Sequence, residues 1–271
     1  MSTVSVIIPV YKKLNEFLIF FQHNIQFLRD CEIIIVNDDP QTYLPQDLPL
    51  NATEHTNIVW LNHQENQGFG KSVNDAARKA TGEYLMLLNT DVKLLDDTWR
   101  SALRALENDT SLFAVSFAQK EKDGRIVGRN ELYFKSGLFH HRALPFDSAP
   151  DNQNGELLPT AWAEGGSTIL RKSMWDTLGG FDENYSPFYW EDVDLSYRAK
   201  LKGWQVLFSP QIMVEHHHES TIGTQYPKSK ITEIAFRNQL YFTSKFAQGY
   251  QRIQYSIFKH ILLPLQKTKG N

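Results

Sequence analysis

The first hundred residues alternate between short apolar runs and segments with helical spacing, and this alternation limits the possible folds more than any other feature. Four runs are typical of strands buried on both faces: "VSVIIPV" (4–10), "EIIIV" (32–36), "NIVWL" (57–61) and "EYLMLL" (83–88). Residues 14–29 and 70–80 lie between them and carry apolar side chains at helical spacing. The pattern predicts an α/β fold in which crossover helices flank a mostly parallel central sheet.

Beyond residue 95 the same signals continue, with one interruption. Residues 96–108 predict a helix capped by Asp96 or Asp97, and "FAVSF" at 113–117 predicts a strand. Between 119 and 160 the pattern weakens into charged, Gly- and Pro-containing sequence, which we expect to form variable loops that contact an acceptor or a partner. Further on we expect a strand and a short helix ending at Gly179, a helix over 191–203, strands at "WQVLFS" and "IMVEHHH", and a helical C-terminal extension.

The composition excludes several classes of protein. A chain of 271 residues with 41% hydrophobic and 13% aromatic side chains can bury a sizeable core, and its net charge of −3 argues against a generally basic nucleic-acid binder. No segment approaches the roughly 18 consecutive apolar residues that span a bilayer, and the N-terminus resembles a strand more than a signal peptide. The single cysteine, Cys31, predicts a buried thiol in a reducing compartment. We therefore expect a cytoplasmic protein, either soluble or peripheral at the inner face of the plasma membrane.

Polar side chains collect where the predicted strands end. In open α/β sheets, ligands bind outside the carboxyl ends of the strands, so these groups predict one ligand crevice. An Asx-type turn explains the Asn89–Asp91 step as well as a metal site does, although one or two carboxylates typically hold a divalent cation that bridges phosphates. The polar strand-end residues are Tyr11, Asn37, Asp38, Asp39, Asn89, Thr90 and Asp91.

The segment "NQGFGKS" at 66–72 is similar to two phosphate-binding motifs but matches neither. A P-loop needs glycine at position 65, which is Glu65, and the third glycine of a dinucleotide fingerprint would fall on Val73. What remains is a glycine-bearing loop that enters a helix. Either its amides and Lys71 meet a phosphate, or it is simply a turn.

Two acids begin a predicted helix in "FYWEDVDL". Glu191 and Asp192 complement the helix dipole there, or one of them, beside Tyr189 and Trp190, is a general base that faces the crevice. The pattern alone does not choose between these interpretations.

Three consecutive histidines follow in "VEHHHES". On a strand, His216 and His218 would share a face while His217 points away, which suits a metal ligand or a polar strand end. The spacing fits none of the usual structural zinc patterns.

Taken in order, four of these segments resemble the inverting glycosyltransferases of family 2, which have the Rossmann-like GT-A fold. The similar segments are "SVIIPVY", "EIIIVNDDP", "NQGFGKSVNDAARKATGEYLMLLNTDV" and "GGFDENYSPFYWEDVDLSYRAKLKGW". The resemblance implies a GT-A domain over 1–245, with a nucleotide-binding half (1–118) and an acceptor-binding and catalytic half (119–226). Residues 246–271 would then form a basic amphipathic tail.

The resemblance also implies a set of residues that contact the nucleotide. Asp38 would accept a hydrogen bond from a pyrimidine base, and Asn89 stands where the family's Asp-x-Asp motif usually has its first acid. Lys71 and Asn74 would lie near the ribose or diphosphate. The implied nucleotide-binding residues are Pro9, Tyr11, Asp38, Lys71, Asn74 and Asn89.

The chemical roles implied by the resemblance fall on later segments. Asp91 and His216 would hold Mg²⁺ or Mn²⁺, which stabilises the charge of the departing nucleotide diphosphate. Asp192 would take the proton of the attacking hydroxyl, with Glu191 beside it. The implied contacts of the donor or acceptor sugar are Gly165, Gly166 and Trp190.

The activity that the resemblance implies is a metal-dependent inverting transfer of a sugar, of rhamnosyltransferase or hexosyltransferase type. The donor would be a UDP-hexose or dTDP-rhamnose, and the acceptor a hydroxyl of a glycan or lipid-linked sugar in polysaccharide or cell-surface glycan synthesis. A nucleotidyltransferase of related fold would need a glycine- and basic-rich loop after the first strand, where this chain has "VYKKLNE". A non-catalytic nucleotide-sugar-binding protein is the other alternative.

The C-terminal part is basic and amphipathic. After Glu233 the chain contains no acid, and Ile253, Ile257, Ile261 and Leu265 recur every four residues. Such a helix lies in a membrane interface or docks on its own domain, and the sequence favours neither.

Overall fold

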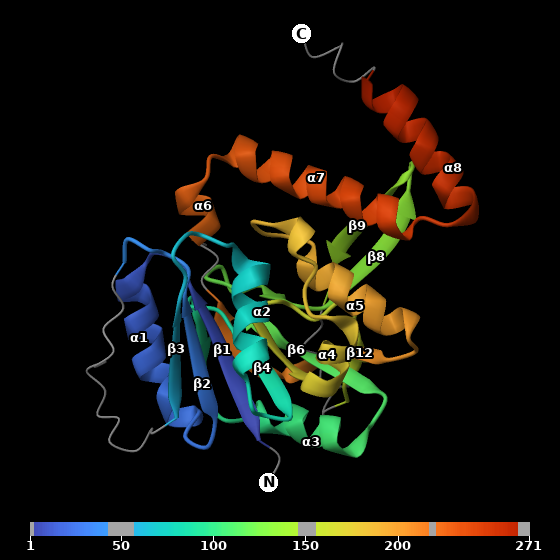
Figure 1. The fold of residues 1–271 in the computed structure, drawn as a ribbon. Coiled ribbons are helices and arrows are strands. Elements are labelled where there is room, and N and C mark those ends of the chain that lie inside the picture. The colour runs from blue at the N-terminus through green and yellow to red at the C-terminus, as the bar shows by residue number, and fades with distance from the viewer. Residues whose placement is uncertain (1–2, 43–56, 146–155, 217–220, 265–271) are drawn as a thin grey trace.

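The computed structural model describes residues 3–42, 57–145, 156–216 and 221–264. In these ranges a ten-stranded mixed sheet forms the centre of the molecule, with helices on both faces (Figure 1). Its strand order is β10-β12-β6-β11-β4-β1-β2-β3, with β5 paired to β12 and β7 to β6.

The predicted parallel strands form one half of this sheet. They are β1 (Val4–Val10), β2 (Glu32–Asn37), β3 (Ile58–Asn62) and β4 (Tyr84–Leu88), and the neighbours β1–β2, β1–β4 and β2–β3 are all parallel. Every residue of β2 and β4 is buried. Near-continuous apolar runs are what such doubly covered strands require.

The other half of the sheet is mixed, which the sequence pattern did not predict. Strand β11 (Ser167–Arg171) runs antiparallel to both β4 and β6 (Leu112–Lys120). Strand β12 (Gln205–His216) then runs parallel to β6 and antiparallel to the short β5 (Val92–Leu94).

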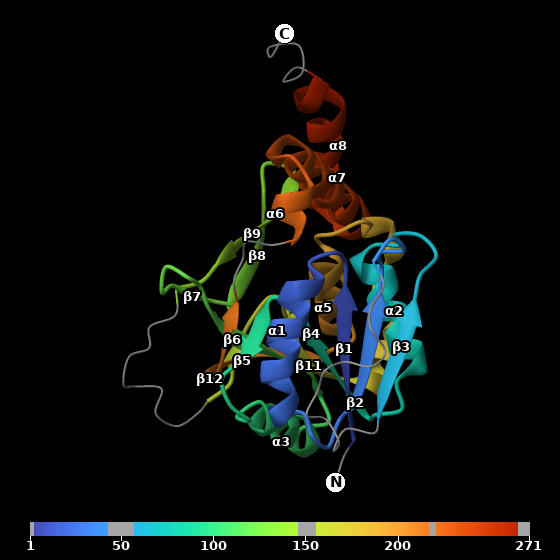
Figure 2. The ribbon, with the colours of Figure 1, turned by 90° about the vertical axis from the view of Figure 1, so that its left-hand side faces the viewer.

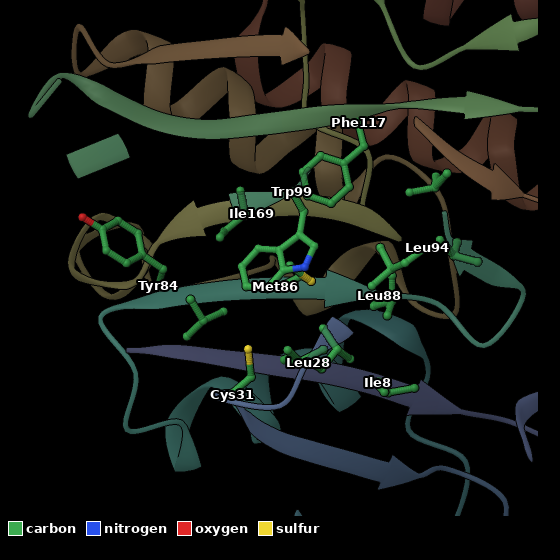
Figure 3. Packing of buried hydrophobic residues seen from close by; sticks show 14 of the residues in the cluster. Ile8, Leu28, Cys31, Tyr84, Met86, Leu88, Leu94, Trp99, Phe117 and Ile169 are labelled. Carbon is green, nitrogen blue, oxygen red and sulfur yellow. The ribbon is translucent and has the colours of Figure 1, made fainter. Parts of the chain in front are cut away.

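Helices bury apolar faces against each side of the sheet. On one side lie α1 (Leu14–Asn24) and α3 (Arg100–Asn108), and on the other α2 (Phe69–Lys79), α4 (Lys172–Leu178) and α5 (Glu191–Leu201). Figure 3 shows the first core, where Trp99 lies among Met86, Phe117 and Ile169. Cys31 is buried in this core as predicted, and burial raises the pKa of its thiol to about 11.

The prediction of variable loops between 119 and 160 is wrong where the structure describes strands in that segment. Strand β6 continues to Lys120, and β7 (Ile126–Val127), a hairpin of β8 (Asn130–Lys135) and β9 (Leu138–Ala143), and β10 (Leu158–Pro159) follow. Ser136 and Gly137 join β8 to β9 with positive φ angles of 52° and 87°, as a two-residue hairpin turn requires. Residues 146–155 lie outside the described ranges.

Two further boundaries differ from prediction. Helix α3 begins at Arg100, because Asp96 accepts hydrogen bonds from Thr98 in a preceding turn instead of capping the helix. The two strands expected after residue 203 are one strand, β12, with an irregularity at 210–212, since Ser209 pairs with Phe117 and Met213 with the next residue, Ala118.

The C-terminal helical extension is present. It comprises α6 (Thr221–Gln225), α7 (Lys228–Phe246) and α8 (Gly249–Ile257), the last continuing as a π-helical turn over Phe258–Leu262. Figures 1 and 2 show α7 lying across the hairpin end of the molecule and α8 projecting beyond it, far from the N-terminus. Lys245 on α7 pairs with the fully buried Asp194 of α5 at 2.6 Å, which ties the extension to the sheet-covering helices.

Helix α8 has two apolar faces with different surroundings. Tyr255 and Phe258 are buried in a third apolar cluster with Leu138, Trp162 and Phe242. The opposite face is exposed, and no described helix is both long and apolar enough to cross a membrane. The exposed apolar side chains of this region are Tyr250, Ile253, Ile257, Ile261 and Leu262.

Candidate active site

A cavity of about 270 Å³ opens at the carboxyl ends of β1, β2 and β4, where the sequence predicted a crevice. It brings together residues that are more than two hundred positions apart in the sequence. Ten of the thirteen predicted site residues line it: Pro9, Tyr11, Asp38, Asn89, Asp91, Gly165, Gly166, Glu191, Asp192 and His216. These ten residues therefore share one cavity, while the role of each stays a prediction.

Asp38 closes the cavity at the end of β2 and also anchors a neighbouring loop. Its carboxylate accepts hydrogen bonds from the backbone N–H groups of Gln67 and Gly68, at 2.8 and 2.9 Å, and lies 2.8 Å from Nδ1 of His63. Because an ionised carboxylate has about four acceptor positions, one remains for a ligand such as a pyrimidine N–H.

Three backbone amides at the start of α2 already have partners within the protein. The N–H groups of Gln67 and Gly68 donate to Asp38, and that of Phe69 donates to the carbonyl oxygen of Pro187 at 3.2 Å. Lys71 lies outside the cavity lining and pairs with Asp75 at 2.7 Å. The predicted phosphate contact by this loop and Lys71 is therefore not supported by their positions.

Asn74 and Trp190 also lie outside the cavity lining. The Asn74 amide donates to the Phe181 carbonyl and the Glu183 carboxylate, at 2.9 and 3.0 Å, and its oxygen accepts from the Phe181 N–H, so it holds this turn instead of a ribose. Trp190 is 5% exposed and its ring packs 5.0 Å from that of Phe242. A sugar cannot stack on a side chain so placed.

Asn89 and Gly166 require each other. The Asn89 N–H donates to the Gly166 carbonyl at 2.9 Å, and a Cβ atom at position 166 would lie only 2.3 Å from Nδ2 of Asn89. Any side chain there would displace Asn89 from the end of β4. Glycine at 166 is thus explained by its protein neighbour, whether or not a sugar approaches it.

Asp91 and His216 meet because β5 pairs with β12, which places His216 opposite Val92. Nε2 of His216 lies 3.2 Å from Oδ1 of Asp91, and Nδ1 lies 2.7 Å from the amide oxygen of Gln119. An amide oxygen only accepts, so Nδ1 carries a proton and donates to Gln119, while Nε2 faces the Asp91 carboxylate. At 3.2 Å, Nε2 and Oδ1 share either a proton or a cation.

This pair fits a divalent metal that also binds phosphates. Mg²⁺ is usually held by one or two carboxylates plus substrate phosphates and water, and a ligating histidine usually donates its other ring N–H to a second protein group, as His216 does to Gln119. No group of three or more His, Cys, Asp or Glu side chains suited to a metal occurs within the described ranges. His218 lies outside those ranges.

Three carboxyl groups line the same cavity. Glu164 lies just before β11, and Glu191 and Asp192 begin α5. Burial raises the pKa of Asp192 to about 6, and burial together with the charge of Asp192 raises the pKa of Glu164 to about 7. Burial and Asp192 also raise the pKa of Glu191 well above its usual value, and Oε2 of Glu191 has no hydrogen-bond partner among the described atoms. Of the three, Asp192 is the most readily ionised and the best suited to accept a proton near neutral pH.

The turn before α5 has an unusual backbone that α7 holds in place. Tyr189 and Trp190 have φ angles of 73° and 79°, a left-handed conformation that is strained for aromatic residues. The fully buried Asn238 on α7 donates from Nδ2 to the carbonyls of Tyr185, Phe188 and Tyr189 at 2.7 to 2.9 Å. Asn238 thereby fixes the direction in which the chain enters Glu191 and Asp192.

Several lining residues escaped sequence reasoning. Gln119 is the last residue but one of β6, in a segment expected to be a loop, and Glu164 immediately precedes the predicted site residues Gly165 and Gly166. Tyr189, 39% exposed, lines the cavity where Trp190 was expected to do so. The polar residues at the end of β6 could have predicted Gln119 as a lining residue, because β6 belongs to the same sheet as β4.

Comparison with known proteins now identifies the family. Residues 5–176 match the family described as glycosyl transferase family 2. The chain belongs to this family. The expected membership among the glycosyltransferases is confirmed.

Three curated proteins illustrate the similarity of this chain to known sequences. The N-acetylglucosaminyl-diphospho-decaprenol L-rhamnosyltransferase of Mycobacterium tuberculosis is 38% identical over 191 residues, which cover 62% of this chain and 62% of that protein. The O-antigen biosynthesis protein RfbC of Myxococcus xanthus is 26% identical over 55% of this chain and 12% of its own. Polypeptide N-acetylgalactosaminyltransferase 3 of Mus musculus is 24% identical over 94% of this chain and 42% of its own. The chain thus spans less than two thirds of each relative.

Solved structures confirm the GT-A fold expected of a family 2 member. A mannosyltransferase from Pyrobaculum calidifontis in complex with GDP-Man and Mn²⁺ superposes with a TM-score of 0.61 at 16% identity, covering 96% of this chain and 70% of that one. GalNAc-T7 with UDP, GalNAc and Mn²⁺ has a TM-score of 0.61 at 15% identity, covering 80% and 44%.

Proposed function

We propose that this family 2 protein transfers a sugar, with inversion, from a nucleotide diphosphate donor to a hydroxyl of a glycan or lipid-linked acceptor. The cavity joins two sets of groups that such a reaction needs. Tyr11 and Asp38 follow β1 and β2, and Asp91, Asp192 and His216 line the same cavity.

The acidic lining of the cavity is the main support for proposing that the reaction depends on a metal. Five acids line it, and no lysine or arginine is found among its described lining residues: the acids are Asp38, Asp91, Glu164, Glu191 and Asp192. A nucleotide diphosphate cannot enter an acidic cavity unless a cation offsets its charge. Asp91 and His216 are the residues that would hold Mg²⁺ or Mn²⁺ there.

The proposed reaction assigns each of the chain's groups a task. Asp192 takes the proton from the acceptor hydroxyl as that oxygen attacks the anomeric carbon from the face opposite the departing diphosphate. The Gly165 N–H, which donates to Oδ2 of Asp192 at 3.2 Å, orients the carboxylate for this transfer. The bound metal would supply electrostatic stabilisation of the leaving diphosphate.

We propose dTDP-rhamnose or a UDP-hexose as donor, and a lipid-diphosphate-linked sugar as acceptor. The support is the 38% identity to a rhamnosyltransferase whose name gives N-acetylglucosaminyl-diphospho-decaprenol as its acceptor. Polysaccharide or cell-surface glycan synthesis in the cytoplasm, at the inner face of the plasma membrane, follows from such an acceptor.

The exposed face of α8 supports peripheral membrane contact. Ile253, Ile257 and Ile261 are 58%, 47% and 54% exposed, and exposed basic side chains such as Arg252 and Lys259 lie on the same helical segment. A basic amphipathic helix of this kind binds anionic lipid surfaces. Sedimentation with vesicles of phosphatidylcholine and phosphatidylglycerol should deplete the protein, and changing the three isoleucines to glutamine should abolish this, whereas Ile19→Gln on α1 should not.

A donor panel tests the central proposal. The full chain is incubated with dTDP-rhamnose, UDP-glucose, UDP-N-acetylglucosamine and GDP-mannose, each with Mn²⁺, Mg²⁺ or EDTA, and thermal shift and diphosphate release are measured. One pyrimidine donor should stabilise the protein only when metal is present. If no donor or nucleoside diphosphate bound with either metal, the proposed function would be wrong.

A further inference from the structure

Glu164 is a carboxyl group at the cavity wall to which the proposed reaction assigns no task. It immediately precedes Gly165 and lines the same cavity as Asp192. Its Oε1 atom accepts a hydrogen bond from Nδ2 of Asn130 at 2.5 Å, and its backbone N–H donates to Oγ of Ser116 at 3.1 Å. Both the side chain and the backbone of Glu164 are therefore fixed.

Asn130 is itself held rigidly. It is 6% exposed, its backbone N–H donates to Oγ1 of Thr160 at 2.9 Å, and its carbonyl accepts from the Ala161 N–H at 2.8 Å. A buried amide fixed in this way gives the Glu164 carboxyl one orientation. Since a carboxyl group has acceptor positions beyond those that Asn130 and Trp162 occupy, it can also accept hydrogen bonds from a ligand in the cavity.

The neighbours of Glu164 indicate whether it lies on the nucleotide side or the acceptor side of the cavity. The next residue, Gly165, donates its N–H to Asp192, which the proposed reaction places against the acceptor hydroxyl. Trp162, two residues before Glu164, belongs to the apolar cluster of the hairpin and the C-terminal helices. Tyr11 and Asp38, the proposed nucleotide contacts, come instead from the ends of β1 and β2. Glu164 is thus on the acceptor side.

The surroundings determine the chemical class of group that Glu164 can bind. The Asp192 carboxylate lies against the neighbouring Gly165, so a phosphate or carboxylate would be repelled there. A sugar hydroxyl is neutral and donates a hydrogen bond, which a fixed carboxyl accepts well. We infer that Glu164 binds a second hydroxyl of the acceptor sugar, beside the one that attacks, and so selects acceptors with two neighbouring hydroxyl groups. This inference rests on the proposed function.

The variant Glu164→Gln tests the inference with little change of shape. Glutamine retains an oxygen that can accept from Asn130, but an amide nitrogen replaces the second oxygen and cannot accept from a hydroxyl. At pH 8, where the Glu164 carboxyl is mostly ionised, the kcat/KM for acceptor should fall roughly 10- to 100-fold, as expected for loss of a hydrogen bond to a charged group. The donor KM should stay unchanged and the melting temperature should not fall, because the buried carboxyl is replaced by a neutral group of the same shape. Glu131→Gln is the control, because Glu131 is an exposed acid near Asn130 that pairs with Arg142.

Deoxy acceptors separate binding by Glu164 from a general effect. The probes are N-acetylglucosamine on a short lipid diphosphate and its 3-, 4- and 6-deoxy analogues. With the unsubstituted protein, loss of the attacking hydroxyl should stop transfer, and loss of one neighbouring hydroxyl should lower kcat/KM roughly 10- to 100-fold. Glu164→Gln should show no further loss with that second analogue.

Two results would overturn the inference while leaving the proposed function intact. One is an unchanged dependence on every hydroxyl in Glu164→Gln, and the other is a raised donor KM with an unchanged acceptor KM. If the unsubstituted protein transferred sugar from no donor, the proposed function would fall, and the inference with it.

Discussion

Replacing Asp192 by asparagine should stabilise the folded protein while abolishing sugar transfer. Burial raises the pKa of Asp192 from 3.8 to about 6, so the ionised group costs the folded state about 3 kcal/mol at about 1.4 kcal/mol per pKa unit. Its two oxygens accept from the N–H groups of Val193 and Gly165 at 2.8 and 3.2 Å. Asparagine keeps one acceptor, and the lost hydrogen bond costs about 1 kcal/mol. The net gain at pH 8 should be about 2 kcal/mol, or roughly 4 °C in melting temperature.

The pH dependence of this gain is the critical observation. Because the pKa is higher in the folded than in the unfolded state, the cost of ionisation is absent below pH 3.8 and complete above about pH 6. Thermal denaturation at pH 8, and at steps toward pH 4, should therefore show a gain that shrinks with acidification. Asp97→Asn removes an exposed acid and should show no such trend. An Asp192→Asn protein that is no more stable at pH 8 would refute the argument from burial, and one that retains full transfer would move the general base elsewhere.

Three other predictions concern the same cavity. Transfer by the unsubstituted protein should fall as pH drops below about 6, because Asp192 must be ionised to accept a proton; a kcat/KM profile that is flat from pH 5 to 8 would contradict this. His216→Ala should weaken activation by Mn²⁺ at least 10-fold while leaving the melting temperature without metal within a few degrees, whereas unchanged Mn²⁺ titration would remove His216 from the metal site. Asn238→Ala should lower kcat more than donor KM and destabilise the protein by about 2 kcal/mol, because three carbonyl groups of the turn before α5 lose their buried donor; an unchanged kcat would show that the turn holds its shape alone.

The parallel half of the fold was predictable because its signals are local. Strands β1, β2 and β4 are buried on both faces, so their apolar runs are nearly continuous and their ends are visible as polar residues. The hairpin β8–β9 was missed because its side chains are mostly half-buried or exposed, and its pattern therefore lacks a clear period. Its turn, Ser136-Gly137, was a usable signal.

The site residues divide in the same way. The positions of Asp38, Asp91 and Asp192 in the cavity were predictable, because each follows a strand or lies in the first turn of a helix at the predicted edge of the sheet. The placement of Asn74 and Trp190 depends on long-range partners, Phe181 and Phe242, which no local pattern reveals. The Glu164–Asn130 contact joins two segments whose folding was not anticipated, so sequence reasoning had no means to find it.

The irregularity in β12 has a consequence for how the chain tolerates changes of length. Residues 210–212 are accommodated between the pairs Ser209–Phe117 and Met213–Ala118, upstream of the pairing that sets His216 opposite Val92. Gln211, the exposed residue of these three, can therefore be deleted and the shortening absorbed locally, so that the imidazole stays at Asp91. Deleting Glu215 instead would shift the strand by one residue past β5 and turn His216 to the opposite face. A change of length at 210–212 thus leaves the Asp91–His216 pair in place. A single deletion four residues later would separate the pair.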